Sequence, residues 1–141
     1  MTDGASLMKI LLVEDSLADI ELTLDALKSA KVANEVAVVR DGASALEHLR
    51  ASADAAPDLV ILDLNLPRMS GHEVLAAMRA DEAMRRIPVA VLTTSSAESD
   101  VATTYDLGAN CFLTKPVDVQ AFIHVVRSID DFWLGLVRLP R

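Results

Sequence analysis

The stretch Leu59-Val-Ile-Leu-Asp-Leu-Asn-Leu-Pro67 decides the fold class of this chain. Leu59 to Leu62 is a continuous aliphatic run that follows Pro57, and such a run is typical of a strand buried on both faces of a parallel sheet. Asp63 ends the run, and Pro67 prevents its continuation. Ligands of open α/β sheets bind outside the carboxyl ends of the strands. Asp63 therefore stands where such a fold does its chemistry, although one aspartate alone fits a turn cap equally well.

Four further apolar runs have the same character, and each is followed by a segment with helical spacing. The predicted strands cover residues 9–13, 34–39, 89–92 and 111–113, and the candidate helix caps are Ser16, Asp41, Ser70 and Asp118. Five strand–helix pairs in strict alternation predict a parallel sheet covered on both faces. An eight-unit barrel would need many more residues. We therefore expect one α/β domain: a three-layer, doubly wound, five-stranded parallel sheet.

Composition and charge narrow the possible partners. The chain has 141 residues, of which 52% are hydrophobic and 24% charged, and this fits one globular domain. The net charge of −8 argues against a general nucleic-acid or anionic-membrane surface. The first seven residues lack the features of a signal peptide and are expected to be disordered, and no run is long enough to span a bilayer. We expect a soluble, cytoplasmic protein with no nucleic-acid or membrane partner.

The carboxyl ends of the predicted strands carry chemically related groups. Glu14 and Asp15 end the first strand, Asp63 the third, Thr93 the fourth and Lys115 the fifth. Three carboxylates at one edge of a sheet repel one another, and they stay ionised only if cations join them. Lys115 supplies one positive charge. A hard divalent cation with oxygen ligands would supply the rest, and Mg²⁺ fits a site with few carboxylates.

Metal, amine and hydroxyl are the groups that phosphoryl transfer to a carboxylate requires. The metal and Lys115 would neutralise charge on the phosphoryl oxygens while Asp63 attacks phosphorus. Thr93 would donate a hydrogen bond to the transferred group. Any one of these residues is common at a strand end as a cap or surface group, but their occurrence together points to a site.

With these motifs in place, the chain resembles the receiver domain of two-component response regulators, over about Met8 to Ile129. The motifs are Leu12-Val-Glu-Asp15, Asp63-Leu-Asn-Leu-Pro67 with Gly71, Leu92-Thr93, and Lys115-Pro116. The resemblance implies a flavodoxin-like strand order of 2-1-3-4-5. It also implies that Asp63 accepts phosphate from a histidine kinase and that phosphorylation and dephosphorylation are self-catalysed. We therefore expect a phosphoacceptor rather than an enzyme in the usual sense.

The same resemblance assigns the metal ligands. Asp15, Asp63 and the backbone carbonyl of Asn65 would hold Mg²⁺, and Glu14 would act through metal-bound water. Glu14 stands where aspartate is more usual in the family, and this departure bears on the details of metal binding.

The resemblance also implies a conformational switch and one unusual peptide bond. Thr93 and Phe112 match the switch pair of the family, and Lys115-Pro116 matches its cis peptide. Phe112 stands where tyrosine is common, so a switch there lacks a hydroxyl and can only repack. Thr94 is bulkier than the residue often found after the switch hydroxyl and is expected to slow access to the site.

Residues 130–141 follow the last predicted helix and form an apolar C-terminal extension. They are too few for an output domain, so we expect output through a downstream protein target or a phosphotransfer protein. The ending resembles stand-alone response regulators paired with bacterial phytochromes, which suggests a bacteriophytochrome kinase as partner. The apolar side chains of the extension are Phe132, Trp133, Leu134, Leu136, Val137 and Leu139. An exposed apolar patch of this kind often marks an interface, so we expect a homodimer; the alternative is an extension that folds back on its own domain.

Three other readings compete with a phosphorylated receiver. A degenerate receiver would act as a constitutive binding module, but intact Asp63, Lys115 and Thr93 argue against it. An aspartyl-phosphate hydrolase of the haloacid-dehalogenase type would place a second aspartate two residues after the nucleophile, where this chain has Asn65. A flavodoxin-like FMN protein would need a phosphate-cradling loop after the first strand, and the two acids there would repel the phosphate.

Overall fold

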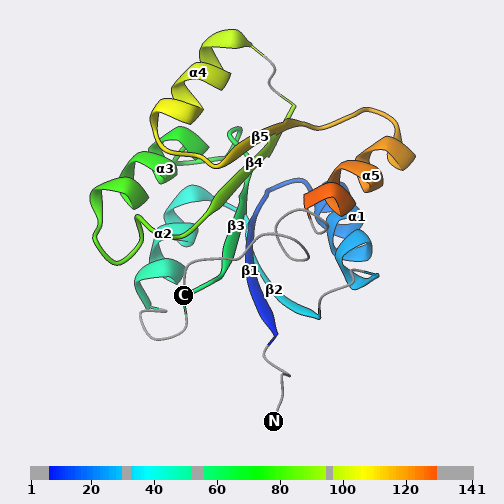
Figure 1. The fold of residues 1–141 in the computed structure, drawn as a ribbon, viewed down its shortest axis with the longest axis horizontal. Coiled ribbons are helices and arrows are strands. Elements are labelled where there is room, and N and C mark those ends of the chain that lie inside the picture. Colours follow the sequence, from blue (N-terminus) through cyan, green and yellow to red (C-terminus); the bar gives the residue numbers. More distant parts are fainter. Residues whose placement is uncertain (1–6, 30–32, 52–55, 95–96, 130–141) are drawn as a thin grey trace.

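The computed structural model describes residues 7–29, 33–51, 56–94 and 97–129. Five strands and five helices alternate along these residues, as predicted (Figure 1). The strands are β1 (Met8–Val13), β2 (Asn34–Val39), β3 (Leu59–Leu62), β4 (Val89–Thr93) and β5 (Cys111–Thr114). The helices are α1 (Leu17–Lys28), α2 (Gly42–Ala51), α3 (Gly71–Ala80), α4 (Glu98–Asp106) and α5 (Val119–Ile129).

The strands form one parallel sheet in the order β2-β1-β3-β4-β5. This confirms the doubly wound fold and the flavodoxin-like order. The register pairs Val13 with Leu62, Leu62 with Val91, and Val91 with Phe112. Because the winding changes direction between β1 and β3, their carboxyl ends border the crevice where such sheets bind ligands.

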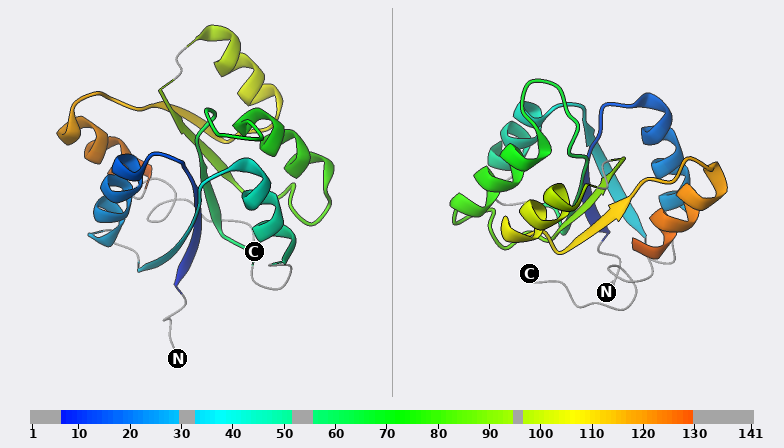
Figure 2. Two further views of the ribbon diagram at one scale, coloured as in Figure 1. Left: turned by 180° about the vertical axis from the view of Figure 1, so that it is seen from behind. Right: turned by 90° about the horizontal axis from the view of Figure 1, so that it is seen from above.

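Helices cover both faces of the sheet and give the three layers (Figure 2). Ile10 and Leu12 of β1 belong to a core cluster shared with α1 and α5. Leu11 and Val13 point the other way, into a cluster shared with α2 and α3. Helix α4 lies beside α3 and β5. All four residues of β3 are buried, which confirms the prediction of a central strand.

Local signals place the helix ends. The Ser70 hydroxyl accepts a hydrogen bond from the Glu73 N–H at 3.2 Å and the Glu73 carboxylate accepts one from the Ser70 N–H, so the predicted capping box forms in full. Ser16 accepts a bond from the Asp19 N–H at 3.3 Å. Asp41 and Asp118 accept backbone N–H groups at the starts of α2 and α5.

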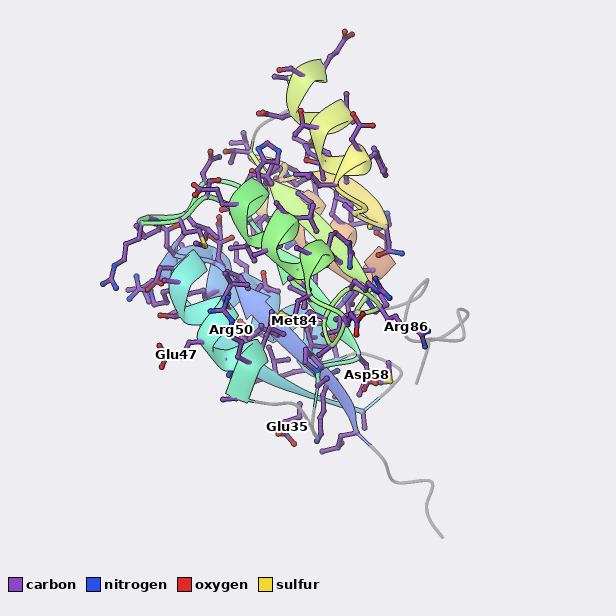
Figure 3. All side chains as sticks on the ribbon, turned by 90° about the vertical axis from the view of Figure 1, so that its left-hand side faces the viewer. Glu35, Glu47, Arg50, Asp58, Met84 and Arg86 are labelled. Atoms are coloured by element: carbon purple, nitrogen blue, oxygen red, sulfur yellow. The ribbon has the colours of Figure 1, made fainter. Side chains whose placement is uncertain are left out.

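The outer side of α2 carries charged side chains, as expected for an amphipathic helix (Figure 3). Glu47 and Arg50 are exposed there, whereas Met84, in the turn after α3, is 3% exposed and belongs to the core. No helix among the described residues is long and apolar enough to cross a bilayer.

The expected cis peptide at Lys115-Pro116 is wrong for this structure. No peptide bond among the described residues is cis. A bond before proline favours the trans form by about 0.5–1 kcal/mol unless its surroundings select the other, and in the trans form the Lys115 side chain already reaches the carboxyl ends of β1 and β3.

Candidate functional site

Three carboxylates meet in the crevice between β1 and β3. Glu14, Asp15 and Asp63 each offer one oxygen, and these oxygens all lie within 4.8 Å of one another. The Asp63 N–H donates to the Val13 carbonyl at 3.0 Å. The ladder between β1 and β3 therefore continues to Asp63 and fixes it beside Glu14 and Asp15, the two acids that follow β1. Glu14 is 3% exposed and Asp63 5% exposed, so two of the three charges are buried.

Lys115 reaches the same place from the end of β5. Its ammonium donates to the carboxylates of Glu14, of Asp19 at 2.8 Å and of Asp63 at 3.0 Å. A lysine has three N–H donors, so each donor has a carboxylate partner. The Lys115 N–H donates to the Thr93 carbonyl at 2.7 Å, and this bond holds the end of β5 against the end of β4.

Burial and charge act against each other in this cluster. Burial alone would lower the pKa of Lys115, but the hydrogen bonds that its ammonium donates to Asp19, Glu14 and Asp63 outweigh burial and raise that pKa above its usual range. Burial raises the pKa of Glu14 to about 7, against the lowering effect of the Lys115 hydrogen bond. The four carboxylates of Glu14, Asp15, Asp19 and Asp63, when all ionised, exceed the single ammonium by three charges. A hard, oxygen-seeking divalent cation fits the oxygens of Glu14, Asp15 and Asp63 and this surplus of negative charge.

Asp19 is a member of the site that the sequence analysis did not assign to it. The spacing from Ser16 marked Asp19 only as part of a helix cap, and its N–H does make that contact. Its carboxylate points instead to Lys115. The available signal was the strand order 2-1-3-4-5 implied by the resemblance, which puts α1 and α5 on the same face of the sheet.

Asn65 connects Asp63 to the end of β4. Its N–H donates to Asp63 Oδ1 at 3.1 Å, and its side-chain amide lies 3.4 Å from the hydroxyls of both Thr93 and Thr94. The contacts of Asn65 in the structure are therefore made by its N–H and its side chain. The metal-binding role predicted for its backbone carbonyl stays a prediction.

The close approach of Gly71 to the backbone of Asp63 and Leu64 sets the position of the loop between β3 and α3. The Gly71 N–H donates to the Leu64 carbonyl at 2.9 Å, and a Cβ on Gly71 would lie 2.3 Å from the Asp63 carbonyl oxygen. Only glycine therefore lets the start of α3 rest directly on the backbone of Asp63.

The predicted switch residues lie on one face of neighbouring strands. Thr93 is fully buried, and it points to the same face as Val91 because side chains alternate along β4. Phe112, the register partner of Val91, is half-buried and packs against the cluster under α2 and α3. The Phe112 N–H donates to the Tyr105 hydroxyl of α4 at 3.1 Å. The switching role of the pair stays a prediction, and so does the homodimer, because residues 130–141 lie outside the described residues.

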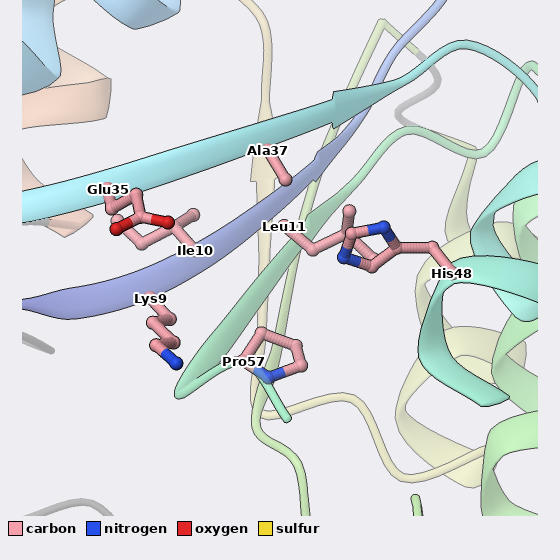
Figure 4. Close-up of a pocket in the computed structure, with 7 residues that line it drawn as sticks. All are labelled: Lys9, Ile10, Leu11, Glu35, Ala37, His48 and Pro57. Carbon is pink, nitrogen blue, oxygen red and sulfur yellow. The ribbon is translucent and has the colours of Figure 1, made fainter. Parts of the chain in front are cut away.

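A separate pocket lies at the amino ends of the strands (Figure 4). Glu14, Asp15 and Asp63 do not line it. Its volume is about 180 Å³, and it is lined by Lys9, Ile10, Leu11, Glu35, Ala37, His48 and Pro57. None of these residues belongs to the predicted site.

Comparison with known proteins agrees with the fold and the acidic crevice. The family model of the response regulator receiver domain matches residues 10–127. The response regulator Rcp1 of Synechocystis sp. is 43% identical over 135 residues, which cover 93% of this chain and 92% of that protein.

Two solved structures are similar to the chain over nearly its whole length. The phosphorylated cyanobacterial phytochrome response regulator RcpA is 45% identical, with a TM-score of 0.92 over 96% of this chain and 100% of that one. The Mn(2+)-bound form of Rcp1 is 42% identical, with a TM-score of 0.90 over 95% of this chain and 99% of that one. The chain belongs to the response regulator receiver family and is similar to phytochrome response regulators.

Proposed function

We propose that the Asp63 carboxylate accepts a phosphoryl group from the phosphohistidine of a sensor histidine kinase, in a reaction that depends on Mg²⁺. One observation carries this proposal. Asp63 lies 3.0 Å from the Lys115 ammonium and offers an oxygen within 4.8 Å of carboxylate oxygens of Glu14 and Asp15. A carboxylate that contacts a fixed cation and lies beside further acids suits attack on an anionic phosphoryl group once a metal is bound.

Glu14, Asp15 and Asp63 would hold Mg²⁺, together with the Asn65 carbonyl that the family resemblance implies. The donor set supports this assignment, because all of the groups are hard oxygens. The similar protein Rcp1 has a Mn(2+)-bound form, which supports a divalent cation. When bound, the ion would shield the charge that collects on the phosphoryl oxygens.

The chemical step is a displacement at phosphorus. An Asp63 carboxylate oxygen forms the new O–P bond while the P–N bond to the kinase histidine breaks, and the electron pair stays on the imidazole nitrogen. The Lys115 ammonium donates a hydrogen bond to Asp63 Oδ2 in this structure. After transfer it can donate to a phosphoryl oxygen instead, and this contact stabilises the transferred group. Water attack on the same phosphorus returns the Asp63 carboxylate and inorganic phosphate. The groups that promote both steps belong to this chain, so both are self-catalysed.

Output would begin at Thr93. The phosphoryl group brings about −2 of charge and new acceptor oxygens next to the end of β4. Thr93 would leave the Asn65 amide to donate to those oxygens, and Phe112 would repack into the space beside it. Because the Phe112 N–H is bonded to Tyr105, the change would reach α4 and the surface formed by α4, β5 and α5. A downstream protein or a phosphotransfer protein would read that surface.

A phytochrome-type histidine kinase is the partner that the relatives support. RcpA is a phytochrome response regulator, and two further similar structures are bacteriophytochrome response regulators, at 45% and 41% identity. The receiver would comprise residues 8–129 and act in the cytoplasm, where such kinases present their phosphohistidine. Residues 130–141 would contribute an apolar contact to a homodimer.

The test is phosphorylation by acetyl phosphate with Mg²⁺, followed by intact mass. We expect the wild-type protein to gain the mass of one phosphoryl group with Mg²⁺ and to gain none when EDTA removes the metal. Asp63→Asn should abolish the gain. Asp25→Asn is the matched control, because Asp25 is exposed on α1 and pairs only with Lys28 among the salt bridges of the described residues. Full-yield phosphorylation of Asp63→Asn would overturn the assignment.

A further inference from the structure

Asp19 binds the Lys115 ammonium from the first turn of α1. Its Oδ2 lies 2.8 Å from Lys115 Nζ, and the Asp19 side chain is 25% exposed. The three acids that meet within 4.8 Å of one another do not include Asp19. Asp19 therefore contacts the lysine of the site but stands outside the group of carboxylates that could hold a metal.

The position of Asp19 is fixed by the start of its helix. Its N–H donates to the Ser16 hydroxyl at 3.3 Å, and its carbonyl accepts from the Thr23 hydroxyl at 2.7 Å. The next residue, Ile20, is 7% exposed and belongs to the core cluster under α1 and α5. The carboxylate is thus presented to Lys115 from a backbone that is anchored on both sides.

Lys115 would compete with a bound cation for Glu14. The Glu14 carboxylate is bonded to Lys115 and is also part of the three-acid group. A divalent ion at that group would draw on the same carboxylate, because it is one of few charged ligands there. Asp19 offers Lys115 a carboxylate that lies outside the three-acid group. With Asp19 in place, Lys115 can give up Glu14 and still remain beside Asp63.

We propose that Asp19 is a positioning residue that anchors Lys115, which releases Glu14 to the divalent cation and holds the ammonium ready for the phosphoryl oxygens. This inference rests on the proposed function of Asp63. Without Asp19, Lys115 keeps Glu14 as its main partner, so both the affinity for Mg²⁺ and the rate of phosphorylation should fall. We expect a loss of about tenfold in each for Asp19→Asn, which is the scale of one hydrogen bond to a charged group.

A double-mutant cycle separates this role from a simple loss of charge. Mg²⁺ affinity is measured by titration calorimetry on the full chain for wild type, Asp19→Asn, Lys115→Gln and the double variant. If Asp19 acts through Lys115, Asp19→Asn weakens Mg²⁺ binding strongly in the wild-type background and less than about twofold in the Lys115→Gln background. An equal loss in both backgrounds would mean that Asp19 acts only through its charge and would overturn the inference.

Two controls complete the experiment. Asp25→Asn removes the same charge from the same helix at an exposed position and should leave Mg²⁺ affinity unchanged. Asp19→Glu restores the carboxylate and should recover part of the loss. Circular dichroism of every variant checks folding. The metal titration needs no phosphorylation, so its result stands apart from the mass measurement: wild type that binds Mg²⁺ but gains no phosphoryl group refutes the proposed function, whereas normal phosphorylation and Mg²⁺ affinity in Asp19→Asn refute the anchoring role.

Discussion

The side-chain amide of Asn65 lies 3.4 Å from the hydroxyl of Thr93 and so bridges the loop after β3 to the end of β4. The same residue donates its N–H to Asp63 at 3.1 Å. Asp63, the proposed phosphoacceptor, and the predicted switch hydroxyl are therefore connected through one residue before any phosphoryl group arrives. That connection leads to the first prediction.

Asn65→Ala should shorten the lifetime of phosphorylated Asp63 severalfold. The side-chain amide contacts both threonines at the end of β4, and the N–H of the same residue is bonded to Asp63. We expect removal of this side chain to open a path for water to the phosphorus. The measurement is the decay of the phosphorylated mass after acetyl phosphate is removed. Asn110→Ala is the control, because the Asn110 side chain accepts a bond from the Val89 N–H at the opposite end of β4. An unchanged decay in Asn65→Ala would show that the amide does not shield the site.

Gly71→Ala should destabilise the fold and displace Asp63. The added Cβ would lie 2.3 Å from the Asp63 carbonyl oxygen and 2.6 Å from Leu64 Cα, and backbone atoms cannot rotate away as a side chain can. We expect a loss of more than about 2 kcal/mol in the free energy of unfolding, measured by urea denaturation, and weaker Mg²⁺ binding.

Gly108→Ala is the companion to this experiment. Gly108 has φ +89°, so a side chain there is strained, but the contact is with Arg79 far from the acids. This variant should lose stability while it keeps the Mg²⁺ affinity of the wild type. Equal losses of Mg²⁺ affinity in both variants would show that the effect of Gly71→Ala is global rather than local.

Metal-free stability should fall as the pH rises from about 4.5 to about 7. Burial raises the pKa of Glu14 from an ordinary value of 4.5 to about 7 in the folded chain. Between these values the native state binds more protons than the unfolded state, so the free energy of unfolding decreases with pH. Urea denaturation in EDTA across this range measures the slope, and Glu14→Gln should flatten it. A slope that is the same in Glu14→Gln would assign the effect to another group.

Binding of Mg²⁺ should strengthen over the same pH window, because the cation requires the ionised carboxylate and displaces its proton. Calorimetric titrations at pH 5.5 and 8 should therefore differ in affinity for the wild type. Asp25→Asn, on the exposed side of α1, should show the same difference as the wild type.

Thr93→Ala should uncouple phosphorylation from Phe112. The hydroxyl is the group expected to move toward the phosphoryl oxygens, and the Phe112 N–H, bonded to Tyr105, is a reporter on the neighbouring strand. In ¹⁵N spectra we expect the Phe112 amide signal to shift on phosphorylation of the wild type and to stay in place in Thr93→Ala. The same shift in both proteins would place the coupling elsewhere.

The sequence predicted the parts of this molecule that depend on local pattern and on topology. Continuous aliphatic runs identified the buried strands, and parallel strands necessarily bring the residues that follow them to one edge, so Asp63 and Lys115 could be placed together. The strand order indicates that α1 and α5 share a face, but which side chain of α1 contacts Lys115 depends on how the two helices pack, so the role of Asp19 was not predicted. The amide contact of Asn65 with Thr93 depends likewise on the path of a loop. The bond before Pro116 is trans. The prediction of a cis bond was wrong because it came from the family pattern and not from the residues of this chain.

The homodimer prediction concerns the chain beyond α5. Ile129, the last residue of that helix, is 2% exposed and closes the core cluster under α1 and α5. The apolar side chains of residues 132–139 therefore follow a core that is already filled, and their burial against a second copy would contribute roughly 1.5–3 kcal/mol each before the costs of association. A two-fold pair in which each extension contacts its partner is the simplest closed arrangement. Light scattering should report a dimer for the full chain at tens of micromolar and a monomer for a chain that ends at Asp131. A full-length monomer, or a dimer that survives the truncation, would rule out this role for the extension.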